Sequence, residues 1–188
     1  VEWGANGNPG GTIYHVEMRN EERSSVGTGP TPLGPNRVKY EDLRANTTYY
    51  AVVWGENQRG VLTGEAVWGL DATDVAAAEI TGVGAGGDAG RSFSVTWMTN
   101  GNPAGTRYSL WRQATGASDR VECGGMTSDN DAASVSSECS GLTPNTVYSV
   151  WVRAEGHNRG FVDSDSKSGR TGTASLTNLE LEPKGGSE

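Results

Sequence analysis

The chain has 188 residues, enough for two small domains, and its 28 glycines and 34% hydrophobic residues suit short strands and turns better than helices. The net charge of −8, without any cluster of Lys and Arg, argues against binding to a nucleic-acid backbone, which needs grouped positive charge. No stretch approaches the ~20 apolar residues that cross a bilayer as a helix, so we expect no membrane span.

One stretch of sequence occurs twice. A strand-like segment ending in Trp, then Asn-Gly-Asn-Pro, then Gly-Thr-x-Tyr, occupies residues 1–14 and returns at residues 95–108. A repeat with matching residues on both sides of a turn indicates that a supersecondary unit has been duplicated. Val1 and Trp3 share one face of the first strand because side chains alternate with period two.

The rest of the first unit is predicted as short strands. Alternation predicts a half-buried strand over residues 13–18, and the glycines and prolines of residues 20–40 exclude a regular helix there. A strand from Tyr49 has Val53 facing inward, with Val52 and Trp54 facing outward. A last strand is expected over residues 61–68, followed by a short link over 69–75.

A second motif also occurs twice, as Leu43, Asn46-Thr47 and Tyr49, and again as Leu142, Asn145-Thr146 and Tyr148. A Tyr that opens a strand just after a sharp loop is typical of the tyrosine corner of Greek-key sandwiches, in which its hydroxyl turns back to the upstream backbone. The segment Asn46-Thr47-Thr48 also fits the N-glycosylation acceptor pattern, a short and frequent match.

The second unit carries the two cysteines and two outward tryptophans. Cys123 and Cys139 favour a structural disulfide, with two free buried thiols as the alternative. Alternation places Trp111 and Trp151 on the outer face of neighbouring strands. These two, with Trp54 of the first unit, could form lateral contacts or stack against sugar rings. Alternatively, they could be covered by neighbouring arginines such as Arg107, Arg112 and Arg153.

The Trp-ending strand, the Leu-x-x-Asn-Thr-x-Tyr corner and the repeat length resemble tandem fibronectin type III domains, of the variety found in long bacterial surface and secreted proteins. The resemblance implies an all-β fold of antiparallel sandwiches that act mainly as spacers, adhesive modules or scaffolds. We expect three parts: residues 1–70, a sandwich that lacks its first strand; residues 71–172, a second sandwich; and residues 173–188, a tail that resembles the first strand of a further domain.

A sandwich without its first strand leaves an unpaired edge and an uncovered core. Three explanations are open: the chain is cut from a longer covalent array, the tail of another copy supplies the strand, or the first domain has only six strands. Strand exchange would join Val1 and Trp3, as the acceptor edge, to Leu176, Leu179 and Leu181, as the donor. Such a head-to-tail contact favours filaments.

The sequence offers little for catalysis. The two histidines, His15 and His157, are far apart, and neither fits a Ser-His-Asp arrangement or a metal-ligand pattern. We therefore expect a non-enzymatic chain with no cofactor and no metal, a structural subunit of an extracellular, bacterial surface or fibre protein. The alternative is a carbohydrate-binding or spacer module of a secreted polysaccharide-active protein or adhesin.

Overall fold

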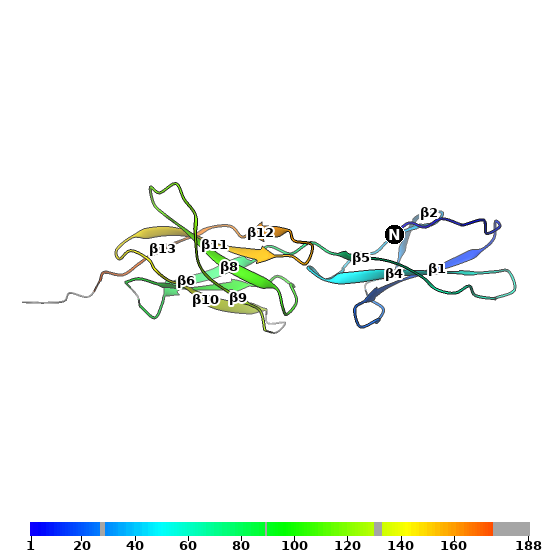
Figure 1. The fold of residues 1–188 in the computed structure, drawn as a ribbon, viewed down its shortest axis with the longest axis horizontal. Helices are drawn as coiled ribbons and strands as arrows, with labels where there is room; N and C mark the ends of the chain where they lie inside the picture. Colours follow the sequence, from blue (N-terminus) through cyan, green and yellow to red (C-terminus); the bar gives the residue numbers. More distant parts are fainter. Residues whose placement is uncertain (27–28, 89, 130–132, 175–188) are drawn as a thin grey trace, which may run out of the picture.

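The computed structural model describes residues 1–26, 29–88, 90–129 and 133–174, and the regular elements in this part of the chain are antiparallel strands. Figure 1 shows two groups of strands that follow each other along the long axis. We call them the first unit, which ends with β5 at Ala72, and the second unit, which begins with β6 at Glu79. The predicted all-β, antiparallel fold class is confirmed.

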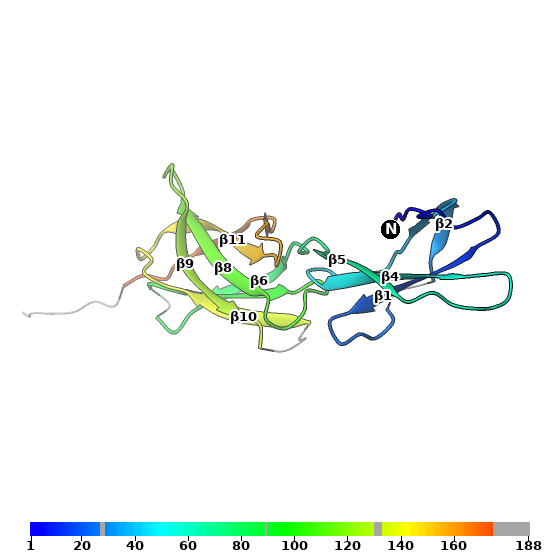
Figure 2. The same ribbon diagram turned by 45° about the vertical axis from the view of Figure 1, so that its right-hand side comes forward.

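The second unit contains two packed sheets, seen from a second direction in Figure 2. One sheet has the order β10 (Ser134–Cys139), β7 (Phe93–Met98) and β6 (Glu79–Ala85). The other sheet contains β9 (Val121–Thr127), β8 (Arg107–Ala114) and β11 (Val147–Glu155), and β11 also pairs with β12 (Phe161–Asp163) and β13 (Lys167–Arg170).

The core of the second unit follows from alternation along these strands. Phe93, Val95 and Trp97 point inward from β7 and are buried against Tyr108 of β8 and Tyr148 of β11. Burial of so many large apolar side chains is the main favourable term in the folding of such a small sandwich.

The first unit repeats this plan with fewer strands. One sheet has the order β1 (Ile13–Asn20), β4 (Thr48–Glu56) and β5 (Ala66–Ala72), and a hairpin is formed by β2 (Thr31–Gly34) and β3 (Arg37–Lys39). Residues 1–3 lie beside β3, where Val1 and Val38 exchange two backbone hydrogen bonds of 2.9 Å. These three residues occupy the place that β7 occupies in the second unit.

Both predicted tyrosine corners are present. The hydroxyl of Tyr49 accepts a hydrogen bond of 2.9 Å from the backbone N–H of Arg44, and that of Tyr148 accepts one of 2.9 Å from Thr143. Asn46 and Asn145, just before these tyrosines, adopt φ values of 47° and 51°. Asn tolerates this left-handed conformation better than most residues, which explains its presence in both corners.

Two details of the first unit differ from the sequence prediction. The last strand begins at Ala66 and extends to Ala72, so the predicted strand over residues 61–68 and the link after it are displaced. Val52, predicted to face solvent, is buried. Arg19 of β1 and Glu65, next to β5, form an ion pair of 3.0 Å across the central strand β4, which carries Val52. Within the sheet Val52 is paired with Glu17 of β1 and with Val67 of β5, so both of these side chains flank it on the outer face.

Candidate docking groove

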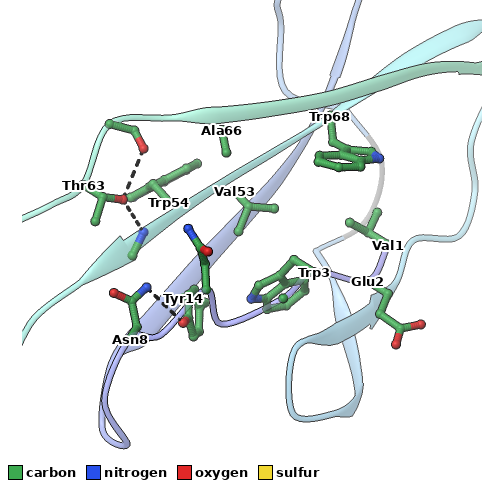
Figure 3. Close-up of a pocket in the computed structure, with 14 residues that line it drawn as sticks. Val1, Glu2, Trp3, Asn8, Tyr14, Val53, Trp54, Thr63, Ala66 and Trp68 are labelled. Atoms are coloured by element: carbon green, nitrogen blue, oxygen red, sulfur yellow. Dashed lines mark hydrogen bonds between the residues drawn. The ribbon is translucent and has the colours of Figure 1, made fainter.

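The first unit has a groove of about 790 Å³ between residues 1–3 and the inner face of the β1–β4–β5 sheet. Figure 3 shows Trp3 and Trp68 on opposite sides of the groove, with Val53 between them. The apolar side chains of the lining belong to Val1, Trp3, Val53, Ala66 and Trp68. Because Trp68 is 77% exposed, a large apolar surface here has no cover among the described residues.

The second unit shows what covers the matching surface. There β6 pairs with β7, which places Val83 opposite Val95 and Ile80 opposite Trp97. Val95 is consequently 0% exposed, whereas Val1, in the same place of the first unit, is 37% exposed. The groove is therefore the site that β6 fills in the second unit.

The backbone at this edge is suited to strand pairing. Val1 and Trp3 direct backbone groups toward β3. Glu2 forms a bridge with Arg37, and its own backbone groups have no hydrogen-bond partner among the described residues. In an antiparallel pair the intervening residue points its N–H and C=O the other way. At the groove edge, the backbone of Glu2 is therefore available for strand pairing, and the side chains of Val1 and Trp3 line the groove. Val1 and Trp3 are the two residues that the sequence analysis predicted as the acceptor edge.

The indole nitrogen of Trp3 is buried and has no hydrogen-bond partner among the described residues, but this does not identify an occupant. The Nε1 atom of Trp97 is in the same situation although β6 is in place beside it. The unpaired indole is therefore a property of this strand position rather than of the groove. The predicted donor residues Leu176, Leu179 and Leu181 lie outside the described residues.

The predicted lateral contacts, Trp54, Trp111 and Trp151, are half-buried rather than exposed. Trp54 stacks on His15, with ring centroids 5.5 Å apart. On the second unit, Trp111 and Trp151 are opposite each other in the β8–β11 pairing, and each carries a guanidinium group over its ring. The arginine cover that the sequence left open is present over these two rings, although Arg120 was not among the arginines expected to supply it.

Arg153 organises this outer face. Its guanidinium lies 4.8 Å from the ring centroid of Trp111 and binds Asp163 through two hydrogen bonds of 2.7 and 3.1 Å. The hydrogen bond from Arg153 holds the pKa of Asp163 below its ordinary value, and the same bond raises the pKa of Arg153. Arg120 lies 4.1 Å above Trp151. The rings thus already have stacking partners on one face.

The joint between the two units is a second polar site, and the sequence did not reveal it. Asn46 is 0% exposed; its Nδ2 donates to Oγ1 of Thr106 at 3.0 Å, and its Oδ1 accepts from the backbone N–H of His157 at 2.8 Å. From the second unit, Asn102 holds both backbone groups of Ala76 through bonds of 2.9 and 2.8 Å. Asn46 therefore joins the two units directly, and Asn102 fixes the link between them to the second unit.

Burial of Asn46 also determines whether the N-glycosylation pattern at residues 46–48 can be used in the folded chain. A glycan attached to Nδ2 would have to occupy the space of Thr106. The folded joint is therefore incompatible with a modified Asn46.

The predicted disulfide is present between Cys123 and Cys139. It joins β9 to β10, which belong to different sheets of the second unit. Within the described residues, no group of three or more His, Cys, Asp or Glu side chains could hold a metal ion. The same part of the chain contains no helix that is long and apolar enough to cross a membrane.

Comparison with known proteins supports the fold. A segment of two fibronectin type III domains from chicken tenascin matches with a TM-score of 0.52 and 15% identity over 85% of this chain and 83% of that one. The sensor domain of an anti-sigma factor from Pseudobacteroides cellulosolvens matches 55% of this chain and all of its own, with a TM-score of 0.39 and 13% identity. The FN1–FN3 domains of chicken CNTN1 match 86% of this chain and 54% of their own, with a TM-score of 0.39 and 20% identity.

The fold is thus all-β and fibronectin type III-like, with two sandwich units in tandem. No protein-family model and no curated protein sequence matches the chain.

Proposed function

We propose that the chain is a non-catalytic structural segment of an extracellular, bacterial surface or fibre protein, and that its copies assemble by strand complementation. The observation that carries the proposal is the groove of the first unit, which has the shape and edge that β6 fills in the second unit. The disulfide and the fibronectin-like fold are compatible with an oxidising, extracellular environment. The proposed occupant is the tail, residues 173–188, of a second copy.

The sequence of the tail supports this choice. In the second unit Ala78 and Ile80 are buried and Val83 packs on the core, and these residues follow Thr73 at the end of the first unit. The spacing from Thr171 to Leu176 equals the spacing from Thr73 to Ala78. Counted from the same two threonines, Leu181 is at the position of Val83.

The middle leucine of the tail, Leu179, does not match Ile80 in the same way. Counted from Thr171, it is one position later than Ile80 is when counted from Thr73. Strand β6 has a bulge between Ile80 and Gly82, so a bulge one or two residues earlier in the tail would turn Leu179 inward. The tail therefore has the apolar content and the length of a first strand.

The geometry of such an exchange is heterologous, because the donor tail and the acceptor groove are different surfaces of the same chain. Heterologous contacts that do not close into a ring produce open filaments. The backbone of Glu2 supplies the hydrogen bonds of strand addition, and the walls of the groove select the side chains.

A peptide-binding experiment tests the proposal. A labelled peptide of residues 173–188 is titrated into the full chain carrying Leu179→Asp and Leu181→Asp, which prevents its own tail from competing. We expect saturable binding by fluorescence anisotropy, and no binding of a peptide with the same two Asp substitutions.

Adjacent residues of β5 provide a matched pair of groove variants. Trp68→Glu places a charge in the groove and should weaken peptide binding at least tenfold, whereas Val67→Glu lies on the opposite face of the same strand and should not. Both side chains are exposed, so neither change should prevent folding. Absence of peptide binding, or equal effects of the two variants, would refute the proposal.

The carbohydrate-binding alternative gains no comparable support. A sugar platform needs an accessible aromatic face, and Arg120 and Arg153 already stack on Trp151 and Trp111. We therefore do not advance it as a second function.

A further inference from the structure

The polar groups that form the joint between the two units recur at equivalent positions elsewhere in the described part of the chain. Asn145 occupies the position in the second corner that Asn46 occupies in the first, with the same left-handed φ. Its backbone N–H donates to Gly172, as that of Asn46 donates to Asp74. The side chain of Asn145 is nevertheless exposed, and no described residue accepts a hydrogen bond from its Nδ2.

The acceptor side of the joint is copied on the first unit. Thr12 donates to the carbonyl of Pro9 at 2.9 Å, as Thr106 donates to that of Pro103 at 2.8 Å. Asn8 donates to the hydroxyl of Tyr14 at 3.2 Å, and Asn102 makes the matching bond to Tyr108 at the same distance.

These matching groups differ only in what covers them. Thr106 and Asn102 are buried, the first against Asn46 and the second against the backbone of Ala76, whereas Asn8 is exposed and Thr12 half-buried. Gln58, which follows β4 as His157 follows β11, completes the set with its backbone N–H. The side chains of the acceptor face are thus already held in the orientation that the joint uses.

We propose that the joint recurs between copies: Asn145 of one chain binds Thr12 and the backbone of Gln58 of a second copy, as Asn46 binds Thr106 and His157 within the chain. The partner is a second copy of this chain, presented by its first unit. The inference rests on the proposed function, because the tail that fills the groove is what brings these two faces together.

The length of the connecting segment permits this arrangement. Asn102 binds the backbone of Ala76 within the chain. The equivalent residue after the second unit is Ala174, because the spacing from Thr171 to Ala174 equals that from Thr73 to Ala76. Asn8 of the second copy would therefore meet the backbone of Ala174. Insertion of the tail and formation of the polar joint are compatible within one connection.

The recurring joint keeps some contacts and loses others. Within the chain, Arg44 donates to the carbonyl of Gly101, and Asn158 donates to Asp74. Thr143 and Gly172 take the places of Arg44 and Asp74 at the end of the second unit, so neither contact can be repeated. The joint between copies is therefore the weaker of the two, and it depends mainly on the amides of Asn145 and Asn8.

Sedimentation of the full chain tests the first part of the inference. Asn145→Gly removes the amide side chain, and Gly accepts the positive φ without strain. Loss of two hydrogen bonds should weaken self-association about tenfold to thirtyfold. Arg23→Gly, an exposed position with a φ of 61° outside the two faces, is the control and should leave association unchanged.

Cross-linking tests the contact itself. Full chains carrying Asn145→Cys and full chains carrying Thr12→Cys are mixed under mild oxidation, so that only a contact between copies can link them. We expect a disulfide-linked dimer, and none when Glu22→Cys, at an exposed turn, replaces Thr12→Cys. A single chain carrying Asn46→Cys and Thr106→Cys gives the reference yield for the joint within the chain.

The outcomes separate this inference from the proposed function. Association that is blocked by Leu179→Asp but unaffected by Asn145→Gly, without the cross-link, supports tail insertion and overturns the recurring joint. A cross-link that persists with Leu179→Asp supports the joint and overturns tail insertion. A wild-type chain that stays monomeric at millimolar concentration overturns both.

Discussion

Replacement of Asn46 by Gly should loosen the joint between the units without disturbing the corner in which it lies. Gly retains the φ of 47°, while the bonds to Thr106 at 3.0 Å and to the N–H of His157 at 2.8 Å are lost. At about 1 kcal/mol for each buried hydrogen bond, the change should cost about 2 kcal/mol of unfolding free energy. The added freedom of Gly in the unfolded chain costs about 0.5–1 kcal/mol more.

Asn145→Gly is the matched control, because Asn145 has a similar φ and its exposed side chain accepts a hydrogen bond from Arg170, the one partner it has among the described residues. The Gly term cancels between the two variants, so Asn46→Gly should be less stable by about 1.5–2 kcal/mol. Urea unfolding followed by tryptophan fluorescence, in a Leu179→Asp background chosen to prevent the proposed tail exchange, measures this difference. Equal losses for the two variants would show that Asn46 does not couple the units.

Three further predictions concern the second unit. Tyr148→Phe removes the buried corner hydroxyl and should cost about 1 kcal/mol or more in the same urea assay, and an unchanged midpoint would contradict the corner assignment. Reduction of Cys123–Cys139 should cost about 3 kcal/mol, measured by unfolding with and without reductant; equal midpoints would show that this cross-link contributes nothing. Arg153 lowers the pKa of Asp163, so this pair should stabilise the fold above the ordinary Asp pKa of 3.8 and lose that effect as the pH falls further. The stability gap between wild type and Asp163→Asn should therefore close in acid, and a gap independent of pH would count against the ion pair.

The repeats in the sequence were sufficient to predict the fold, because the structure that each one forms depends on residues close together in the sequence. The Tyr148 corner depends on a hydroxyl that reaches a backbone N–H only five residues upstream, so its signal lies within one short stretch. The groove could be located for a similar reason, since Val1 and Trp3 match a strand whose neighbour is visible in the second copy.

The joint was missed because it depends on contacts distant in sequence. Asn46 and Asn145 have the same local motif, yet Asn46 is buried against Thr106, sixty residues away in the sequence, and Asn145 is exposed. The cover on Trp151 has the same origin. Arg120 reaches it from the segment before β9, and strand alternation contains no information about that segment.

The disulfide between Cys123 and Cys139 also limits how far the second unit can be extended by a pulling force. A sandwich pulled from its two ends lengthens by nearly the full contour of its chain once it yields. A sequence separation of 16 residues, at up to ~3.4 Å each, means that about 55 Å of that length stays locked in the closed loop while the bond is intact. Under tension the unfolded second unit would therefore be shorter in oxidising surroundings than in reducing ones. Its extended length would depend on the redox state of its surroundings.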